Sequence, residues 1–407
     1  MSQAMDQADL GKDEQPRPSR LHGLSSGPSE TVARLPDFCD LALDGLTKMR
    51  LGDGHFPQTM RSISNQNGTG TRPEGGNLRY AIIVAQGLGW LPESTQRSVL
   101  GKTSAAELAL VCAHRAADAD DIGAVALAAW AAAETAGVFA GALFDRLETM
   151  LASDNVVETV PCAWALTAAM AARHLGRVDK LKIAATQRLL AAQGAGWLFG
   201  HVTPVGAAHW HRAHLGCFAD QVYPIQALAR LGYAENNPEA LQAANACAGR
   251  IVELQGTAGQ WWWHYDTRDG SVVEGFPVYS VHQHAMAPMA LLDLREAGGT
   301  DHRAAVARGL EWINSHPETD DPIVSPADGM IWRKVGRTEP AKLVRSMSAI
   351  STSLKRGWRL PGLNAVFPPG KIDYECRPYE LGWLLYAWHS GGVVGRLSPP
   401  PRADQIN

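Results

Sequence analysis

The stretch Ala244–Leu291 reads ANACAGRIVELQGTAGQWWWHYDTRDGSVVEGFPVYSVHQHAMAPMAL. It begins with apolar residues at the spacing of an amphipathic helix. At Gln255 the helical pattern ends in a Gly-containing turn, which is followed by the tryptophans Trp261–Trp263, and a second helical segment begins near Ser280. A glutamine can satisfy free backbone groups at a helix end, and an indole can pack across the turn onto the next helix. The stretch therefore predicts a helical hairpin.

The same pattern occurs earlier in the chain: a helical segment followed by Gln, Gly and Trp, which we call a Gln phrase. Gln193–Trp197 reads QGAGW and also follows an amphipathic, helix-like segment. Hairpins repeated every 50 to 60 or so residues are typical of solenoids and closed rings. Strand patterns are nearly absent, and the segment 62–77 is expected to be a polar, Gly-rich loop. The sequence predicts an all-α fold, an (α/α)-barrel (toroid) of helical hairpins.

Composition sets limits on this fold and its partners. The chain has 407 residues, of which 45% are hydrophobic and 19% charged, with a net charge of −4. This length is enough for one large core, predicted over residues 31–395, between a disordered tail (1–30) and a Pro-rich tail (396–407). The charge gives no basic footprint for nucleic acid, and nothing supports peripheral membrane contact. Without a hydrophobic signal segment, we expect a cytoplasmic protein.

Three aspartates at the predicted start of a helix are the sharpest catalytic candidates. Asp118, Asp120 and Asp121 form the sequence DADD. Crowded carboxylates cannot all ionise cheaply, so one of them can remain a neutral acid near pH 7. In a dry aromatic cavity such an acid could protonate a double bond, and the chain has 13 tryptophans to line one. On its own, such a motif is more often a helix N-cap than a catalytic acid, and this structural interpretation stays open.

The Gln-Gly-Trp phrases and the DADD motif together resemble the α/α toroids of terpene cyclases and prenyltransferases. In the class II cyclases the DxDD motif supplies the acid, so the resemblance implies that Asp120 donates the proton and that Asp118 and Asp121 assist it. It also implies a small isoprenoid substrate that cyclises in an aromatic cavity. The chain departs from the family's pattern after the motif, where Ile122-Gly123 stands, and it has no second toroid. It also lacks an aspartate-rich metal motif, so we expect no cofactor and no metal, with Mg²⁺ needed only for a diphosphate substrate.

A second set of residues supports an alternative function. Histidine, aromatic, acidic and basic side chains gather in two stretches of the last third of the chain: Trp261, Trp262, Trp263, His264, Tyr265, Tyr279, His282, His284, Glu375, Arg377 and Tyr379. They resemble the inner wall of carbohydrate-active α/α barrels, such as epimerases, lyases and unsaturated-uronyl hydrolases. The resemblance implies saccharide stacking on the indoles, His282 or His284 as an acid/base and Arg377 as a grip for a carboxylate. The structural alternative for Glu375, Arg377 and Tyr379 is a network that closes the ring.

Other histidines admit several roles. His209, His211 and His214 could supply metal ligands, but no Cys or acid stands at a familiar ligand spacing beside them. Buried structural roles or acid/base roles are more typical of such a pattern. A third possibility is a toroid without catalysis that serves as a binding module.

Overall fold

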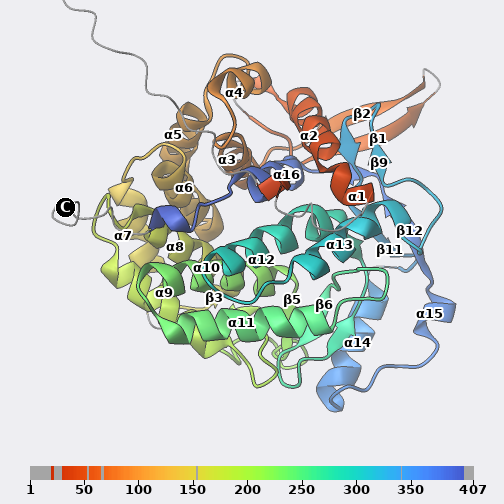
Figure 1. Ribbon diagram of the computed structural model, residues 1–407. Helices are drawn as coiled ribbons and strands as arrows, with labels where there is room; N and C mark the ends of the chain where they lie inside the picture. Colours follow the sequence, from red (N-terminus) through yellow and green to blue (C-terminus); the bar gives the residue numbers. More distant parts are fainter. Residues whose placement is uncertain are drawn as a thin grey trace, which may run out of the picture.

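The fold is described from a computed structural model that covers residues 20–22, 30–52, 55–65, 68–152, 155–340 and 342–397. Six helices form an inner ring in which each packs against the next along the chain and the last packs against the first (Figure 1). These inner helices are α3 (Leu78–Leu88), α6 (Ile122–Glu134), α8 (Thr159–Ala172), α10 (Ala219–Ala234), α12 (Ala287–Glu296) and α16 (Pro378–His389). The π-helical turn η3 (His282–Met286) leads directly into α12.

Six further helices pack outside the ring. Five of them follow, in the chain, an inner helix that they pack against, and the first packs against the last inner helix. They are α2 (Leu35–Met49), α5 (Ala105–Ala116), α7 (Gly141–Met150), α9 (Asp179–Ala192), α11 (Pro238–Glu253) and α13 (Arg303–Ser315). Almost every residue of α6 and α8 is buried, whereas α9 and α11 bury one face. Helices that are apolar all round belong inside a structure, and those with one apolar stripe belong at its surface. The predicted toroid of helical hairpins is confirmed.

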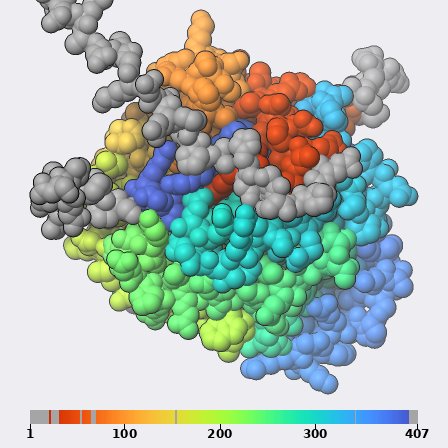
Figure 2. All heavy atoms as spheres, in the orientation of Figure 1, coloured from red at the N-terminus to blue at the C-terminus, as the bar shows by residue number. Residues whose placement is uncertain are grey.

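The remaining helices lie around this ring. They are η1 (Arg20–His22), α1 (Glu30–Ala33), α4 (Glu93–Leu100), α14 (Leu343–Leu354), α15 (Leu363–Val366) and η4 (Gly395–Leu397). In the space-filling view the red surface of the first helices adjoins the cyan surface of the residues near 310, in agreement with the contact between α1 and α13 (Figure 2). The first and last hairpins thus meet and close the ring.

The two Gln phrases have the same geometry. The side-chain amide of Gln193 donates to the carbonyl of Trp197 (3.0 Å) and to that of Ala243 in α11 (3.0 Å). Gln255 donates in the same way to Gly259 (3.0 Å) and to Ala305 in α13 (2.9 Å). Each glutamine therefore closes its own turn and ties it to the next outer helix, as a capping role predicts.

The tryptophans of the two phrases differ. Trp261 is fully buried, whereas the side chain of Trp197 is 55% exposed and its backbone has a positive φ of 66°. The expectation that the indole packs across the turn holds for Trp261 alone.

The expectation that strands are nearly absent is wrong. Short antiparallel strands precede or follow most inner helices: β1 (Thr59–Asn65), β2 (Gly68–Glu74), β3 (Val157–Glu158), β4 (Val202–Thr203), β5 (Leu215–Cys217), β6 (His264–Asp266), β7 (Val272–Glu274), β8 (Val278–Tyr279), β9 (Val324–Ser325), β10 (Met330–Ile331), β11 (Lys334–Arg337), β12 (Pro369–Asp373) and β13 (Glu375–Cys376). They form the sheets β13-β1-β2, β5-β6-β7 and β12-β11-β8 and the pairs β3-β4 and β9-β10. The predicted loop 62–77 is mostly the β1–β2 hairpin, whose pairing runs from Thr59–Glu74 to Asn65–Gly68.

Buried charges occupy the rim where the inner helices end. Asp293 of α12 pairs with Arg230 of α10 (2.7 Å) and with Arg20 of η1 (2.5 Å), and all three side chains are at most 5% exposed. Arg20 also donates to Glu296 (2.7 Å) and to the carbonyl of Ala387 (3.2 Å). Cations near helix C-terminal ends are favourable because unpaired carbonyls gather there.

Most residues of the two predicted tails lie outside the described part of the chain, and the predicted domain boundaries stay predictions. Within residues 1–30, η1 is docked through Arg20, as described above. None of the helices in the described ranges combines the length and the apolarity that crossing a bilayer requires.

Candidate functional site

The opposite rim is formed by the N-terminal ends of the inner helices, and it carries most of the polar candidates. Asp118, Asp120 and Asp121 are all exposed there. Asp121 is the N-cap of α6: its carboxylate accepts from the backbone N–H of Gly123 (3.0 Å) and from Arg79 Nε (2.7 Å). Burial would raise the pKa of Asp121, but Arg79 outweighs it and holds that pKa below the ordinary value. The motif is a solvated helix cap, and the prediction of a buried neutral acid at Asp120 is wrong.

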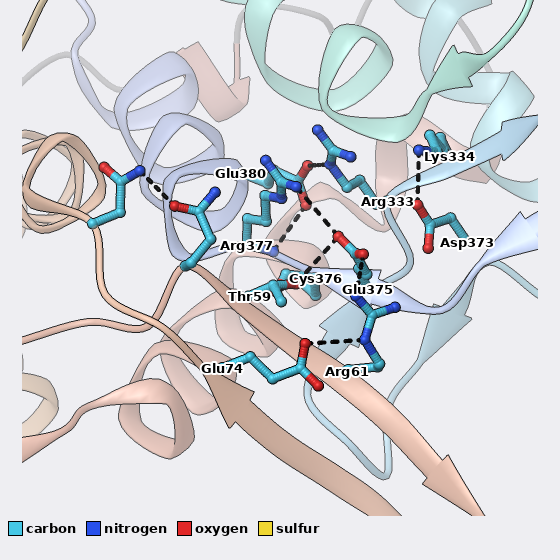
Figure 3. A network of polar contacts seen from close by, with 12 residues as sticks. Thr59, Arg61, Glu74, Arg333, Lys334, Asp373, Glu375, Cys376, Arg377 and Glu380 are labelled. Atoms are coloured by element: carbon cyan, nitrogen blue, oxygen red, sulfur yellow. Dashed lines mark hydrogen bonds and ion pairs between the residues drawn. The ribbon is translucent and has the colours of Figure 1, made fainter. Parts of the chain in front are cut away.

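Glu375 and Arg377 take part in the contacts that join the last hairpin to the first (Figure 3), and Tyr379 packs beside them on Tyr80. Strand β13 pairs with β1, and Glu375 accepts from Arg61 (2.6 Å) and Arg377 (3.4 Å). The guanidinium of Arg377 also donates to the hydroxyl of Tyr80 (3.0 Å), whose ring lies 4.7 Å from that of Tyr379. Because Arg377 is already paired with a carboxylate, this geometry supports ring closure rather than a grip for a ligand.

A buried acid starts helix α16 beside this network. Glu380 accepts from the backbone N–H of Arg377 (3.0 Å) and from Arg333 Nε (3.2 Å). Burial raises the pKa of Glu380 to about 7, although Arg333 and Arg377 oppose this rise. Both oxygens of Glu380 are engaged and its side chain is 1% exposed, so it stabilises the helix start and does not face solvent.

An aromatic group links this network to the next part of the rim. Arg333 lies over the ring of Tyr279 at 5.0 Å, and that ring lies 4.7 Å from Trp263. His282, in η3, lies 4.4 Å from Phe218 and 5.0 Å from Tyr279. The predicted site residues Trp263, Tyr279 and His282 are therefore brought together at the N-terminal ends of α10 and α12.

Other predicted residues are not at the rim. Trp261, Tyr265 and His284 are fully buried in the core, and Trp388 donates to the backbone carbonyl of His284 (2.8 Å). The indole of Trp262 donates to Leu254 (2.8 Å) and lines a separate cleft. Of the two histidines that sequence reasoning considered as acid/base groups, only His282 lies near the rim.

Burial also determines the charge of these histidines. It lowers the pKa of His264, His282 and His284 to about 3, so all three imidazoles are neutral near pH 7. A fully buried neutral imidazole such as His284 is poorly suited to exchange protons with a substrate.

A cleft of about 740 Å³ opens beside Trp263, between the loop after β4 and the strands β5 and β6. An adjoining lobe of about 270 Å³ shares Trp263 and His264 with it and reaches α14. Three cations line these spaces: Arg212, Lys342 and Arg345. Among the described residues, no carboxylate lies within ion-pair distance of any of the three. The cleft thus presents uncompensated positive charge next to an indole.

A compact group of polar side chains forms one wall of this cleft. Asp220, in the first turn of α10, is fully buried and accepts from His201 Nδ1 (3.0 Å) and from the backbone N–H of Cys217 (2.7 Å). The carboxylate of Asp220 raises the pKa of His201. Ligand atoms of His201, Cys217 and Asp220 lie within 4.8 Å of one another, so these three residues could hold a metal ion. We call them, together with His264, the cleft cluster.

Sequence reasoning missed Asp220 and the three cations as site residues. His201 and Asp220 are 19 positions apart, and no familiar motif has that spacing. Lys342 is the N-cap of α14 and Arg345 lies in its first turn, within the connection between α13 and α16, and both reach the cleft only through the tertiary fold. The single signal in the sequence was the density of histidines between His201 and His214.

No family model matches the chain, and no curated protein sequence matches it. Solved structures resemble it in fold. An unsaturated glucuronyl hydrolase specific for heparin matches with a TM-score of 0.52 and 13% identity, over 90% of this chain and 100% of the other. A possible GH105 family member from Salmonella enterica serovar Paratyphi A matches with 0.52 and 14%, over 91% and 95%.

An unsaturated glucuronyl hydrolase variant from Streptococcus agalactiae matches with a TM-score of 0.54 and 12% identity, over 95% and 97% of the two chains. These neighbours are saccharide hydrolases, not terpene cyclases. Together with the exposed DADD motif, they overturn the resemblance to class II cyclases, and with it the isoprenoid substrate and the cyclase reaction. What they establish for this chain is the fold.

Proposed function

We propose that this chain is a carbohydrate-active hydrolase that binds an anionic, uronate-containing oligosaccharide in the cleft beside Trp263. The observation that carries the proposal is the set of three cations, Arg212, Lys342 and Arg345, which line the cleft without a carboxylate partner among the described residues. Unpaired cations beside an aromatic wall suit a ligand that has both apolar ring faces and carboxylates.

The chemistry of the cleft supports a sugar acid over a neutral sugar. Arg345 lies over the indole of Trp263, 5.9 Å from its centroid, so an acidic group on a sugar at this wall is within reach of a guanidinium. Helix α10 begins at the same wall, and the positive end of its dipole favours negative charge. The fold neighbours include hydrolases that remove unsaturated glucuronyl groups, which are uronates.

The reactive groups are assigned to the cleft cluster, because the imidazole of His201 lines the cleft and the buried carboxylate of Asp220 lies behind it, 3.0 Å from its Nδ1. Asp220 is fully buried, so it acts on the substrate through His201, which it hydrogen-bonds and whose pKa it raises. Asp220→Asn keeps the shape of the side chain but removes its charge, and it should abolish turnover while the protein stays folded.

The test is a binding and turnover assay with unsaturated-uronate disaccharides and with neutral disaccharides of the same linkage. We expect binding and product release for the uronates only, and weaker binding at higher ionic strength. Arg345→Ala should weaken binding by about 10- to 100-fold, the range for one charge-assisted hydrogen bond. Trp263→Ala should also weaken it, whereas Trp262→Ala, a matched control in the separate cleft, should not.

Equal affinity for neutral and anionic sugars would contradict the proposed substrate class. Uronate binding without turnover would contradict the hydrolase and leave a binding module.

A further inference from the structure

The side chains of the cleft cluster carry the kinds of donor atom that bind transition metals in proteins. His201 comes from the loop before β4, Cys217 from the end of β5 and Asp220 from the first turn of α10. Their ligand atoms, a nitrogen, a sulfur and an oxygen, lie within 4.8 Å of one another. Zinc is bound by this combination of imidazole, thiolate and carboxylate, whereas Mg²⁺ and Ca²⁺ prefer oxygen alone.

A fourth residue points independently to a ligand at this place. His264 pairs with Cys217 across the β5–β6 ladder, so both side chains lie on the same face of the sheet, and both line the cleft. His264 is only 6% exposed, and its Nδ1 has no hydrogen-bond partner in the described part of the chain. A buried polar atom without a partner is costly, and such atoms in native proteins call for an explanation.

We propose that the cleft cluster is a binding site for one divalent transition metal ion of the zinc type, with His201, Cys217 and Asp220 as the ligands already gathered and His264, which lies outside that 4.8 Å group, as the fourth. The Asp220 carboxylate and the Cys217 thiolate carry two negative charges, which balance the charge of the ion. Binding breaks the S–H bond of Cys217 and releases its proton to solvent, as metal binding by thiols generally does. The neutral imidazoles of His201 and His264 complete a tetrahedral set.

The contacts already present hold the ligands near one another. The backbone N–H of Cys217 donates to Asp220 (2.7 Å), and this hydrogen bond holds the carboxylate of Asp220 next to Cys217. His201 lies 3.0 Å from the same carboxylate. A metal would replace the hydrogen bond between His201 and Asp220 and would give His264 the partner it lacks. The site lies in the cleft of the proposed function but does not depend on saccharide chemistry. A bound ion would take His201 and Asp220 as ligands, so in the metal-bound form these two groups do not transfer protons.

The experiment uses the untagged full-length protein, stripped of metal and titrated with Co²⁺ and then Zn²⁺ in the absence of saccharide. We expect one Co²⁺ per chain, a thiolate-to-cobalt charge-transfer band in the near ultraviolet, and displacement of Co²⁺ by Zn²⁺. Cys217→Ser should remove the band, and His264→Gln should weaken affinity by at least about tenfold. His209→Asn is the matched control, because His209 lines the same cleft but lies outside the cluster, and it should bind metal normally.

Thermal melting of each metal-free variant confirms that it is folded before metal is added. Absence of stoichiometric Co²⁺ binding by the wild type would overturn the proposal, and so would a band that survives in Cys217→Ser. Equal losses in His264→Gln and His209→Asn would also overturn it, because they would indicate nonspecific capture by surface histidines. Since no saccharide is present, failure of the hydrolase proposal leaves these outcomes unchanged.

Discussion

Replacing Arg20 by alanine tests whether the segment before the first hairpin is an integral part of the ring. The arginine is 5% exposed on its side chain and donates to Asp293 (2.5 Å) and Glu296 (2.7 Å). Removing one partner of a buried ion pair costs about 3–5 kcal/mol, because the other charge is left behind. Asp293 keeps Arg230 at 2.7 Å and Gln226 at 3.0 Å, so we expect the lower end of that range, about 3 kcal/mol.

Urea denaturation followed by circular dichroism measures this loss of unfolding free energy. Arg34→Ala is the control, because Arg34 is 43% exposed and lies 3.9 Å from Asp37 in a surface pair; it should change stability by less than about 1 kcal/mol. If Arg20→Ala costs no more than this control, the buried ion pair is not formed in solution and the argument fails.

The same substitution should alter the response to acid. Burial would raise the pKa of Asp293, but Arg230 and Arg20 outweigh it and hold that pKa below the ordinary value. A depressed native pKa stabilises the fold above the unfolded pKa of about 3.9, and that stability is lost as the pH falls through the native pKa. Without Arg20 the native pKa of Asp293 should rise, so acid unfolding should begin at a higher pH than in the wild type.

Other expected outcomes concern single side chains. Because burial raises the native pKa of Glu380 from 4.5 to about 7, its contribution is present at low pH and lost as the pH rises through 7, a change of about 3 kcal/mol at 1.36 kcal/mol per unit. Glu380→Gln should flatten that part of a stability–pH profile, and an unchanged profile would contradict the assignment. Asp121→Ala should cost about 1 kcal/mol through loss of the N-cap, and Asp120→Ala less than about 0.5 kcal/mol, in urea denaturation; a larger effect of Asp120 would refute the view of it as solvated. His284→Leu should leave stability within about 1.5 kcal/mol, because both ring nitrogens lack partners among the described residues; a loss near 3 kcal/mol or more would reveal an unseen partner.

The sequence was sufficient to predict the ring of hairpins, because its main signals are local. The apolar, Ala-rich pattern of α6 has no polar face, which requires burial on all sides. Gln193 and Gln255 stand at helix ends with a glycine directly after each, and both make the capping contacts expected of them.

The strands were missed because of their length and composition. Most have two or three residues, which is too short for an alternating pattern to be recognised. The longer hairpin β1–β2 pairs polar residues such as Arg61 with Arg72 and Ser62 with Thr71, so it lacks the apolar alternation of a half-buried sheet.

The site was harder to predict than the fold, for two physical reasons. An aspartate cap and a catalytic aspartate use the same residue type at the same helix end, and only burial distinguishes them; Asp120 is exposed. The cleft cluster is assembled from separate segments by the pairing of β5 with β6 and by the first turn of α10. Neither the solvent exposure of a side chain nor such a meeting of distant segments can be deduced from spacing along the chain.

The π-helical turn at His282–Met286 has a consequence for how the aromatic group of Phe218, Tyr279 and His282 arose. The N–H of Ala287 bonds to the carbonyl of His282, five positions earlier, so this turn holds one residue more than an α-helical turn. An α-helix advances about 100° per residue, so deleting one residue here would swing His282 about that far away from Phe218. A single codon inserted into an ancestral helix would account for a histidine beside Phe218, without any change in the helices that surround it.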